Sequence, residues 1–441
     1  MLKIIDELLW GPGTLALLLG TGIFLNVRMR FLPWRNLPRA LRSALGREAR
    51  QTGSGGVSSF SALMTTLAAT LGTGNIVGVS TALAAGGPGA LVWMEVSALL
   101  GMSIILAEST LAVKYRKADR QGGHTGGPMY VMEQRLGRAG RKLGLLYALF
   151  AALAGLGIGS MTQANAAAQA LDSLLHIPPH ATGAILSFLA LLVILGGIRS
   201  ISKAASVLVP VMAAAYLAAG IAVILVHWRT LPSALSELLR SAFSFRAAAG
   251  GAAGIAAMRW GIARGVYSNE AGLGSSGIAA AAADSTSPVG QGYISMTGPF
   301  FDTVVMCTVT GLAVCCSGVL GMADGAALTM LAFGTVLGSA GETFVTVSIV
   351  LFAFSTIIGW EYLGETAFTF LTRRRGRLLY RVLFALAAFA GAAGTPDTVF
   401  RLADICNALM CLPNLICLLA LSGEVSRDIS AYERIKQRKK L

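Results

Sequence analysis

Charged residues are scarce in this chain of 441 residues, because Asp, Glu, Lys and Arg together make up only 13% of it. A soluble domain carries roughly 25% charged residues. With 55% hydrophobic residues and a mean hydropathy of +0.68, the composition indicates an integral membrane protein with several spans. The net charge of +14 lies in short loops between apolar runs, which is typical of the positive-inside bias and not of a nucleic-acid partner.

Motifs for several kinds of chemistry are also missing. The chain has no Walker A lysine, no H-E-x-x-H and no G-x-S-x-G, so neither ATP drive nor these hydrolytic mechanisms are indicated. Its four histidines lie in loops or at span ends, which argues against a buried histidine proton relay. The six cysteines lie in apolar segments without zinc spacing and are expected to be small buried side chains. A membrane-embedded enzyme is therefore only a distant alternative.

Apolar stretches long enough to cross a bilayer, about 20 residues each, predict eleven spans. They are 9–27, 57–86, 89–113, 143–171, 181–197, 204–227, 248–283, 291–320, 341–371, 378–394 and 399–422. The first is expected to be retained, because Asp6 and Glu7 stand where a signal peptide is basic. The shorter apolar segment 324–340 is predicted to be a re-entrant or surface helix, with a twelfth span as the alternative.

The basic residues predict how the chain is oriented. If the N-terminus lies outside, 28 Lys and Arg residues fall on one face and five on the opposite face, while Arg259 and Arg264 lie inside the seventh span. Because the positive face is the cytoplasmic one, the C-terminus is expected inside. The predicted location is the inner (plasma) membrane of a bacterium, crossed many times.

The spans divide into two similar halves. Residues 1–50 would hold an extra N-terminal helix and a basic cytoplasmic segment, and 425–441 a basic cytoplasmic tail. Spans two to six fill 51–230, and spans seven to eleven fill 247–424. Since five spans is an odd number, the second half starts from the opposite side of the membrane. The expected fold is therefore all-α with an inverted repeat.

Each half opens with an interrupted span. The first break carries Gly72-Thr73-Gly74-Asn75, and the second carries Ser268-Asn269-Glu270 between glycines. Unsatisfied backbone groups in lipid cost several kcal/mol each, so a break needs protein, water, an ion or a ligand to meet them. The start of a half-helix suits a carboxylate, and the freed carbonyls before it suit a sodium ion. Paired breaks thus indicate a secondary transporter of amino acid zwitterions, with glycine kinks made for packing as the alternative.

Other polar side chains inside the predicted spans are candidates for function, because they are costly there. They are Gln163, Asn165, Asp302, Ser355, Thr356, Trp360 and Glu361. Thr356 and Trp360 are four residues apart and share one helix face, so they could close a pocket around a small side chain. Trp360 could equally serve packing. We expect Glu95 and Glu108 to pair with Arg259, Arg264 or loop bases, or Arg264 to pair with Glu270 or Asp302.

The chain resembles the alanine or glycine:cation symporter family, the sodium:alanine symporters, from about Gly53 to Glu424. The motifs that carry the resemblance are Gly72-Thr73-Gly74-Asn75-Ile76, Gly86-Gly87-Pro88-Gly89-Ala90, Gly126-Gly127-Pro128-Met129-Tyr130, Arg264-Gly265-Val266-Tyr267-Ser268-Asn269-Glu270-Ala271-Gly272-Leu273-Gly274 and Gly359-Trp360-Glu361-Tyr362-Leu363-Gly364-Glu365. It implies a leucine-transporter-type fold, a five-plus-five inverted repeat with two discontinuous helices that follows one extra helix. It also implies uptake of alanine or glycine with sodium by alternating access.

The resemblance also implies roles for single residues. Thr73, Gly74 and Asn75 would hold the substrate carboxylate, and Gln163, Thr356 and Trp360 would shape the rest of the pocket. One sodium ion would involve Ser355 or Thr356, and a second would draw on Asn75, Ser268 or Asn269, with Asp302 as a weaker candidate. Leu363 replaces the second aromatic residue that is usual in the family.

Several points stay open at this stage. A proton-coupled carrier of the same fold is the alternative, because carboxyl side chains lie inside the predicted spans: Glu95, Glu108, Glu270, Asp302 and Glu361. The order of preference among alanine, glycine and serine, the acceptance of D-amino acids, the sodium stoichiometry and the oligomeric state do not follow from the sequence.

Overall fold

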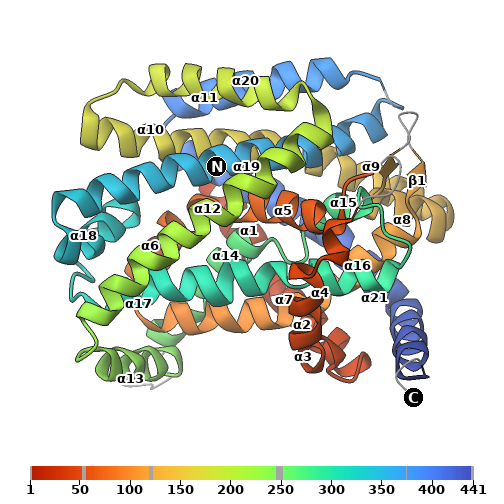
Figure 1. Ribbon diagram of the computed structural model, residues 1–441, viewed down its shortest axis with the longest axis horizontal. Coiled ribbons are helices and arrows are strands. Elements are labelled where there is room, and N and C mark those ends of the chain that lie inside the picture. Colours follow the sequence, from red (N-terminus) through yellow and green to blue (C-terminus); the bar gives the residue numbers. More distant parts are fainter. Residues whose placement is uncertain (1, 52–55, 119–122, 245–251, 374, 439–441) are drawn as a thin grey trace.

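The computed structural model describes residues 2–51, 56–118, 123–244, 252–373 and 375–438. This part of the chain is almost entirely helical, and its only sheet is the antiparallel pair β1 (Lys117–Ala118) and β2 (His124–Thr125). Helices run in roughly parallel layers, with α8 and β1 at one end of the molecule and α13 and α18 at the other (Figure 1). The predicted all-α fold is confirmed.

The N-terminal part forms a unit beside the two halves. It contains α1 (Leu2–Leu9), α2 (Pro12–Arg28), α3 (Leu32–Arg35), α4 (Leu37–Leu45) and the 3-10 turn η1 (Glu48–Arg50). Gly11 separates α1 from α2, so the first predicted span begins at a helix boundary. Arg30 and Phe31 both have positive φ angles, 56° and 57°, which turns the chain between α2 and α3.

The first half contains the interrupted helix α5 (Ser59–Thr70), η2 (Thr73–Asn75) and α6 (Val77–Gly86). The elements that follow are α7 (Gly89–Lys114), α8 (Pro128–Arg135), α9 (Gly137–Ala154), the π-helix η3 (Gly155–Met161), α10 (Thr162–Leu175), α11 (Pro179–Ile194), α12 (Gly197–Val226) and α13 (Leu231–Ala242). Helices α9, η3 and α10 are continuous and together cover the predicted fourth span.

The second half starts with the interrupted helix α14 (Ala252–Asn269) and α15 (Ser275–Ala281). It continues with α16 (Pro288–Ser295), the π-helix η5 (Phe300–Cys307), α17 (Thr308–Cys316), α18 (Gly325–Leu337), α19 (Ser339–Leu371), α20 (Arg377–Ala393) and α21 (Pro396–Arg438). Both predicted breaks are therefore real interruptions of helices. The boundary predicted at 424/425 lies inside α21, which continues as one helix of 43 residues.

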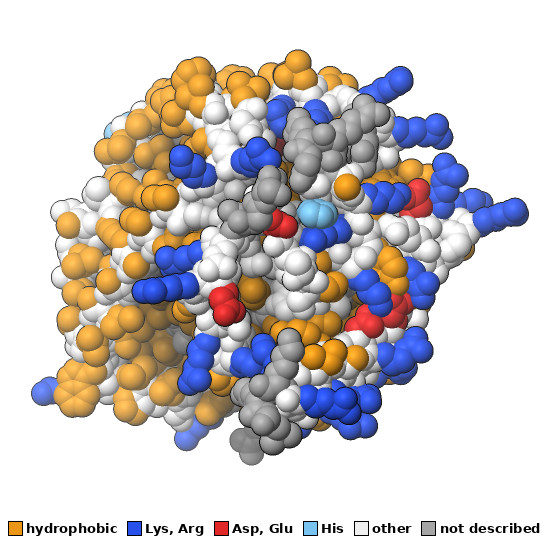
Figure 2. Space-filling view, turned by 45° about the vertical axis from the view of Figure 1, so that its right-hand side comes forward, with side chains coloured by type: hydrophobic (Ala, Val, Ile, Leu, Met, Phe, Trp, Pro, Cys, Tyr) orange, Lys and Arg blue, Asp and Glu red, His pale blue; other side chains and the backbone are white. Residues whose placement is uncertain are grey.

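Seven helices of the described residues are long and apolar enough to cross a membrane, and α6, α11 and α18 are shorter apolar helices. With 13 residues, α18 is too short to span by itself, in keeping with the predicted re-entrant or surface helix. Hydrophobic side chains gather on the left of the space-filling view, and Lys and Arg side chains gather on the end of the molecule to the right (Figure 2). The number of spans and the inverted repeat stay predictions.

Small residues let the helices that carry the breaks approach their neighbours closely. A methyl group on Gly101 of α7 would lie 2.6 Å from the Ala271 side chain, just after α14. A methyl group on Gly359 of α19 would lie 2.7 Å from the Ala69 backbone nitrogen of α5. Close backbone approach of this kind is how helices pack in membranes, and it places both breaks deep inside the bundle.

Helix α21 contacts the rest of the molecule over its whole length. Asp404 lies near its start, and Asn414 in its middle donates to the carbonyl of Gly272 at 2.9 Å. Toward its end, Glu424 pairs with Lys114 at 2.8 Å and with Arg135 at 2.9 Å. Glu433, two turns further on, pairs with Arg39 of α4.

Candidate functional site

The first break is held open by side chains that satisfy its backbone. Helix α5 ends at Thr70, Gly72 is extended, and η2 begins at Thr73. The Asn75 Oδ1 atom accepts a hydrogen bond from the backbone N–H of Gly72 at 3.0 Å, and this bond closes the turn. A methyl group on Gly72 would lie 2.5 Å from Thr356 Oγ1, so this position requires glycine for space.

The second break is also buried and polar. Glu270 has a positive φ of 56°, a conformation that non-glycine residues rarely adopt and that is common at functional sites. The Asn269 Oδ1 atom accepts from the Ala271 N–H at 3.0 Å, and Asn269 Nδ2 donates to Thr303 Oγ1 at 3.3 Å. Ser268, Asn269 and Glu270 are each 1% exposed, so no solvent competes for these bonds.

The two breaks meet at Asn75, Ser268 and Asp302. Asn75 Nδ2 lies 2.8 Å from Asp302 Oδ1 and 3.1 Å from Ser268 Oγ, and Ser268 donates to Asp302 Oδ2 at 2.9 Å. A methyl group on Gly74 would contact Ser268 Cα at 3.4 Å. The structure thus brings these three residues together: the Ser268 hydroxyl and the Asp302 carboxylate supply oxygen atoms of the kind that a small cation binds, and the Asn75 amide nitrogen donates to both.

Gln163 and α19 complete the surroundings of the first break. Gln163 Oε1 accepts from the Thr73 backbone N–H at 3.2 Å and from Thr73 Oγ1 at 3.0 Å. From α19, Ser355 Oγ and Thr356 Oγ1 lie 3.3 Å and 3.4 Å from the Leu71 carbonyl oxygen. The two hydroxyls and the carbonyl at the end of α5 thus form a group of oxygen atoms of the kind that sodium binds. No cluster of three or more His, Cys, Asp or Glu that could hold a metal occurs among the described residues.

Trp360 lies at the second break. Its Nε1 donates to Glu270 Oε1 at 2.6 Å, and its side chain is fully buried. Gly159 of η3 lies against the indole, so the ring is enclosed by the π-helix on one side. The structure thus brings Thr356 to the first break and Trp360 to the second, although both share α19.

A cavity with a volume of about 610 Å³ leads to the first break. Thr73 and Gly74 line its inner end, and Tyr267 lines it from α14. Its outer part is lined by the first residues of α18 and α21, for example Gly325 and Phe400. Gln163, Thr356 and Trp360 are not among the residues that line it, so they lie behind the surface that the cavity exposes.

Several predicted ion pairs are wrong. Glu95 accepts from Thr308 Oγ1 at 2.8 Å, and Glu108 accepts from Asn414 Nδ2 at 3.2 Å, so neither forms its main contact with an arginine. Arg264 pairs with Asp404 of α21 at 3.0 Å and not with Glu270 or Asp302. The physical reason is that Arg264 lies six residues before Glu270, more than one helical turn away, and its guanidinium meets the Asp404 side chain of α21 instead.

Other predicted polar residues lie apart from the breaks. Glu361 points toward α20, where its Oε1 is 3.7 Å from Arg381 Nε. Asn165 Nδ2 donates to the carbonyls of Gly391 and Gly394, each at 2.8 Å, which ties α10 to the end of α20. These two residues therefore serve helix packing at some distance from the site.

Two features of the site escape sequence reasoning. Asp302 lies within the π-helix η5, and Gln163 follows the π-helix η3, whose Ile158 carbonyl accepts from Gln163 Nε2 at 3.0 Å. A π-helix shifts the side chains after it by one residue, and such bulges are frequent at functional sites. Tyr267 is the second feature, since the sequence gives it no role at the site: it lines the cavity and donates to Thr162 Oγ1 at 3.2 Å.

The fold is that of a known class of membrane transporter. A crystal structure of MhsT in complex with L-phenylalanine superimposes with a TM-score of 0.59 at 15% identity, covering 84% of this chain and 90% of that one. Together with the interrupted helices, this likeness shows a leucine-transporter-type fold and confirms the predicted all-α fold class.

The family follows from the sequence comparisons. The profile of the sodium:alanine symporter family matches residues 1–441, and the chain belongs to this family of secondary amino acid symporters. It is 45% identical over 444 residues to the sodium/alanine symporter AgcS of Methanococcus maripaludis, covering 99% of this chain and 98% of that protein. It is 46% identical over 444 residues to an uncharacterized transporter of Haemophilus influenzae, covering 99% and 96%.

Proposed function

We propose that this chain imports small neutral amino acids, chiefly alanine and glycine, together with sodium. The observation that carries the proposal is the inner end of the 610 Å³ cavity, where Thr73 and Gly74 of the first break are presented to a ligand. The name of the Methanococcus maripaludis relative, a sodium/alanine symporter, supports the choice of ligand.

In this proposal the substrate carboxylate binds Thr73, Gly74 and Asn75. The helical segment η2 and α6 has its positive dipole end there, while the N–H groups of Gly72 and Thr73 are bonded to Asn75 and Gln163. The close contact between Gly72 and Thr356 leaves little room beside the carboxylate, which favours a small side chain. Gln163, which holds Thr73, and Trp360, which holds Glu270, would fix the positions of both breaks around the ligand.

Sodium would be bound as co-transported substrate at two groups of oxygen atoms. The hydroxyls of Ser355 and Thr356 with the Leu71 carbonyl support one position. Asn75, Ser268 and Asn269 would form the other, which is supported by the oxygen atoms of Ser268 and of the neighbouring Asp302 carboxylate. Because the second group joins both breaks and η5, an ion there would couple their positions to the sodium gradient.

The cycle that we propose is alternating access around this central site. The outer cavity reaches Thr73 and Gly74, and Gly359 of α19 packs tightly against Ala69 of α5 beside the first break. The two halves, 51–230 and 247–424, would be the inverted repeats that move against each other. We also propose that the N-terminus lies outside and the C-terminus in the cytoplasm of a bacterial inner membrane.

Uptake into proteoliposomes tests the proposal. Radiolabelled L-alanine should accumulate under an inward sodium gradient and should not accumulate when choline replaces sodium. Equal uptake in both buffers would exclude sodium coupling. A panel of competing amino acids then ranks alanine, glycine, serine and the D-isomers.

A second candidate is a proton-coupled carrier of the same fold. The observation in its favour is that Glu95, Glu108 and Glu270 form hydrogen bonds with Thr308, Asn414 and Trp360, and that none of the three forms an ion pair with a Lys or Arg within the described residues. Carboxyl groups buried without a cation are favoured in their protonated form. Uptake driven by a pH gradient in sodium-free buffer would identify this mechanism. A separate enzymatic activity is not part of either proposal.

A further inference from the structure

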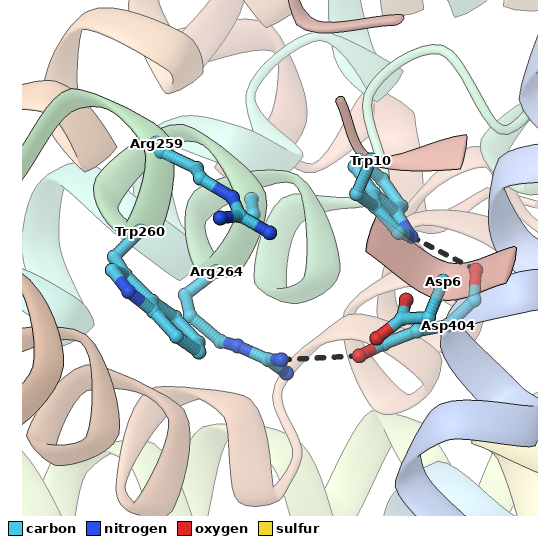
Figure 3. Close-up of a pocket in the computed structure, with 7 residues that line it drawn as sticks. Asp6, Trp10, Arg259, Trp260, Arg264 and Asp404 are labelled. Carbon is cyan, nitrogen blue, oxygen red and sulfur yellow. Dashed lines mark hydrogen bonds and ion pairs between the residues drawn. The ribbon is translucent and has the colours of Figure 1, made fainter. Parts of the chain in front are cut away.

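A small niche opens beside the outer cavity, between α14 and the N-terminal helix α1. It has a volume of about 50 Å³ and is lined by Asp6, Trp10, Arg259, Trp260, Arg264 and Asp404 (Figure 3). Four of these residues, Asp6, Trp260, Arg264 and Asp404, also line the 610 Å³ cavity. The niche therefore adjoins the larger cavity that leads to Thr73 and Gly74.

Opposite charges line opposite walls of the niche. Arg259 and Arg264 come from α14, and Asp6 and Asp404 come from α1 and from the first turns of α21. Figure 3 shows the two arginines and Trp260 on one side and Trp10 with both aspartates on the other. A zwitterionic amino acid carries the same two charges, one at each end of a short backbone.

The second wall is held in place by its own contacts. Trp10 Nε1 donates to the backbone carbonyl of Asp404 at 2.9 Å, which attaches the N-terminal segment to α21. Asp6 also lies 3.5 Å from Arg401 of the same helix. The N-terminal unit, which lies outside both halves of the fold, thus contributes a carboxylate to the substrate path.

Arg264 has donors to spare. Its Nη2 binds Asp404 at 3.0 Å, while its buried Nε has no hydrogen bond within the described part of the chain. A guanidinium carries five N–H donors, so one carboxylate does not use them all. The guanidinium lies over the rings of Trp260 and Tyr267, 5.6 Å and 5.3 Å from their centres, which fixes its position.

The niche is also of the right size. A single water molecule needs about 10–15 Å³ by the same measure, so the volume of about 50 Å³ equals that of about four waters. This space takes the charged end of a glycine or alanine zwitterion, and the rest of the ligand would project into the adjoining outer cavity. Tyr267, one turn after Arg264, lines the path from the niche to the first break.

We propose that this niche is an outer binding site at which a small zwitterionic amino acid is captured before it reaches the central site. The carboxylate of the ligand would bind Arg264 and Arg259, and its ammonium group would bind Asp6 and Asp404. The inference rests on the proposed function, since it assigns the same substrate to a second site of the same path.

Uptake kinetics with charge-neutralising variants test the capture site. Asp6→Asn and Arg259→Gln should each raise the KM for L-alanine by about twofold to fivefold, as expected for loss of one partly exposed charge contact, with little change in maximal rate. Asp172→Asn and Arg229→Gln are matched controls, because both side chains are exposed and neither lines the niche. Asp6→Glu should restore the original KM.

Equilibrium binding separates capture from a structural role of α1. In Asn75→Ala, which is expected to weaken alanine binding at the central site, a weak and saturable alanine-binding event should remain, and adding Asp6→Asn should remove it. If the Asp6 and Arg259 variants match their controls in KM, or if no weak binding remains, the niche is not a binding site. Failure of the proposed function is distinguishable, because the unaltered chain would then show no sodium-driven alanine uptake at all.

Discussion

The Asn75 amide donates to the Asp302 carboxylate at 2.8 Å, although the two residues are 227 positions apart in the chain. This bond joins the first break to η5, and Ser268 of the second break binds the same carboxylate at 2.9 Å. One carboxylate therefore connects three segments that are each irregular in backbone geometry. The central site is a property of their contact and not of any one motif.

Replacing Asn75 tests this connection. Asn75→Ala removes the bonds to Asp302 and to the Gly72 N–H, and hydrogen bonds to charged groups contribute about 1.5–3 kcal/mol. We expect alanine affinity to fall by about tenfold or more while the protein remains folded, which size-exclusion chromatography in detergent checks. Unchanged affinity would place the carboxylate site elsewhere.

Gly72 is expected to tolerate no side chain. In Gly72→Ala the added methyl group would lie 2.5 Å from Thr356 Oγ1, and overpacking of this kind costs about 1–3 kcal/mol. Transport should be lost or strongly reduced. The second variant Gly72→Ala with Thr356→Ala removes the clashing oxygen and should recover stability in a thermal unfolding assay. If the pair is no better than the single variant, the clash is not the cause.

Trp360 should act through Glu270. Trp360→Phe keeps an aromatic ring but removes the 2.6 Å hydrogen bond to Glu270, and Trp360→Ala removes both. We expect both variants to lower the alanine uptake rate, and Trp360→Ala alone to weaken discrimination against larger amino acids. Competition by leucine and phenylalanine measures that selectivity. If the uptake rate and the selectivity are unaltered in both variants, Trp360 serves only to pack the helices.

Removing one partner of the Arg264–Asp404 ion pair should destabilise the protein more than replacing both partners with apolar residues. Removing one partner of a buried ion pair costs about 3–5 kcal/mol, whereas exchanging both for apolar residues is often neutral. Their side chains are 15% and 10% exposed, so the pair is largely desolvated. Arg264→Leu should therefore lower the unfolding temperature more than the double variant Arg264→Leu with Asp404→Leu. Equal loss would indicate that solvent screens the pair.

His124, in β2 between α7 and α8, should make stability depend on pH. Burial is the largest cause that lowers its pKa, and Arg116 lowers it further, whereas Asp284 acts in the opposite direction. Because protonation is harder in the folded state, His124 favours folding above its unfolded pKa of about 6.5, and this contribution is lost as the pH falls through the lower folded pKa. When the pH is lowered below about 6.5, the unfolding temperature should therefore fall. It should fall less in His124→Gln than in the unaltered chain, and thermal unfolding at several pH values measures the difference.

The sequence predicts the breaks well and their partners poorly. Gly72 and Gly74 within an apolar run are a local signal, because any backbone break in lipid must be explained. The partner of Arg264 is 140 positions away on α21, and several carboxylates were equally plausible until the helices were placed. Charge pairing between helices depends on packing, which periodicity does not encode.

The π-helices mark the second limit of sequence reasoning. Asp302 and Gln163 face the site because η5 and η3 each shift the helical register. A regular period of 3.6 residues would direct these side chains elsewhere. Both residues are costly polar groups within the predicted spans, and the reason that they converge on the breaks is visible only in three dimensions.

Helix α21 has a mechanical consequence. Along one rod it carries Asp404 at the niche, Asn414 against the second break, and Glu424 among the bases of the opposite face. If α21 tilts as a rigid body, its contacts at one end would loosen while its contacts at the other end tighten. Pro413 has no N–H to donate within the helix and lies beside Asn414, so the helix would pivot near these two residues.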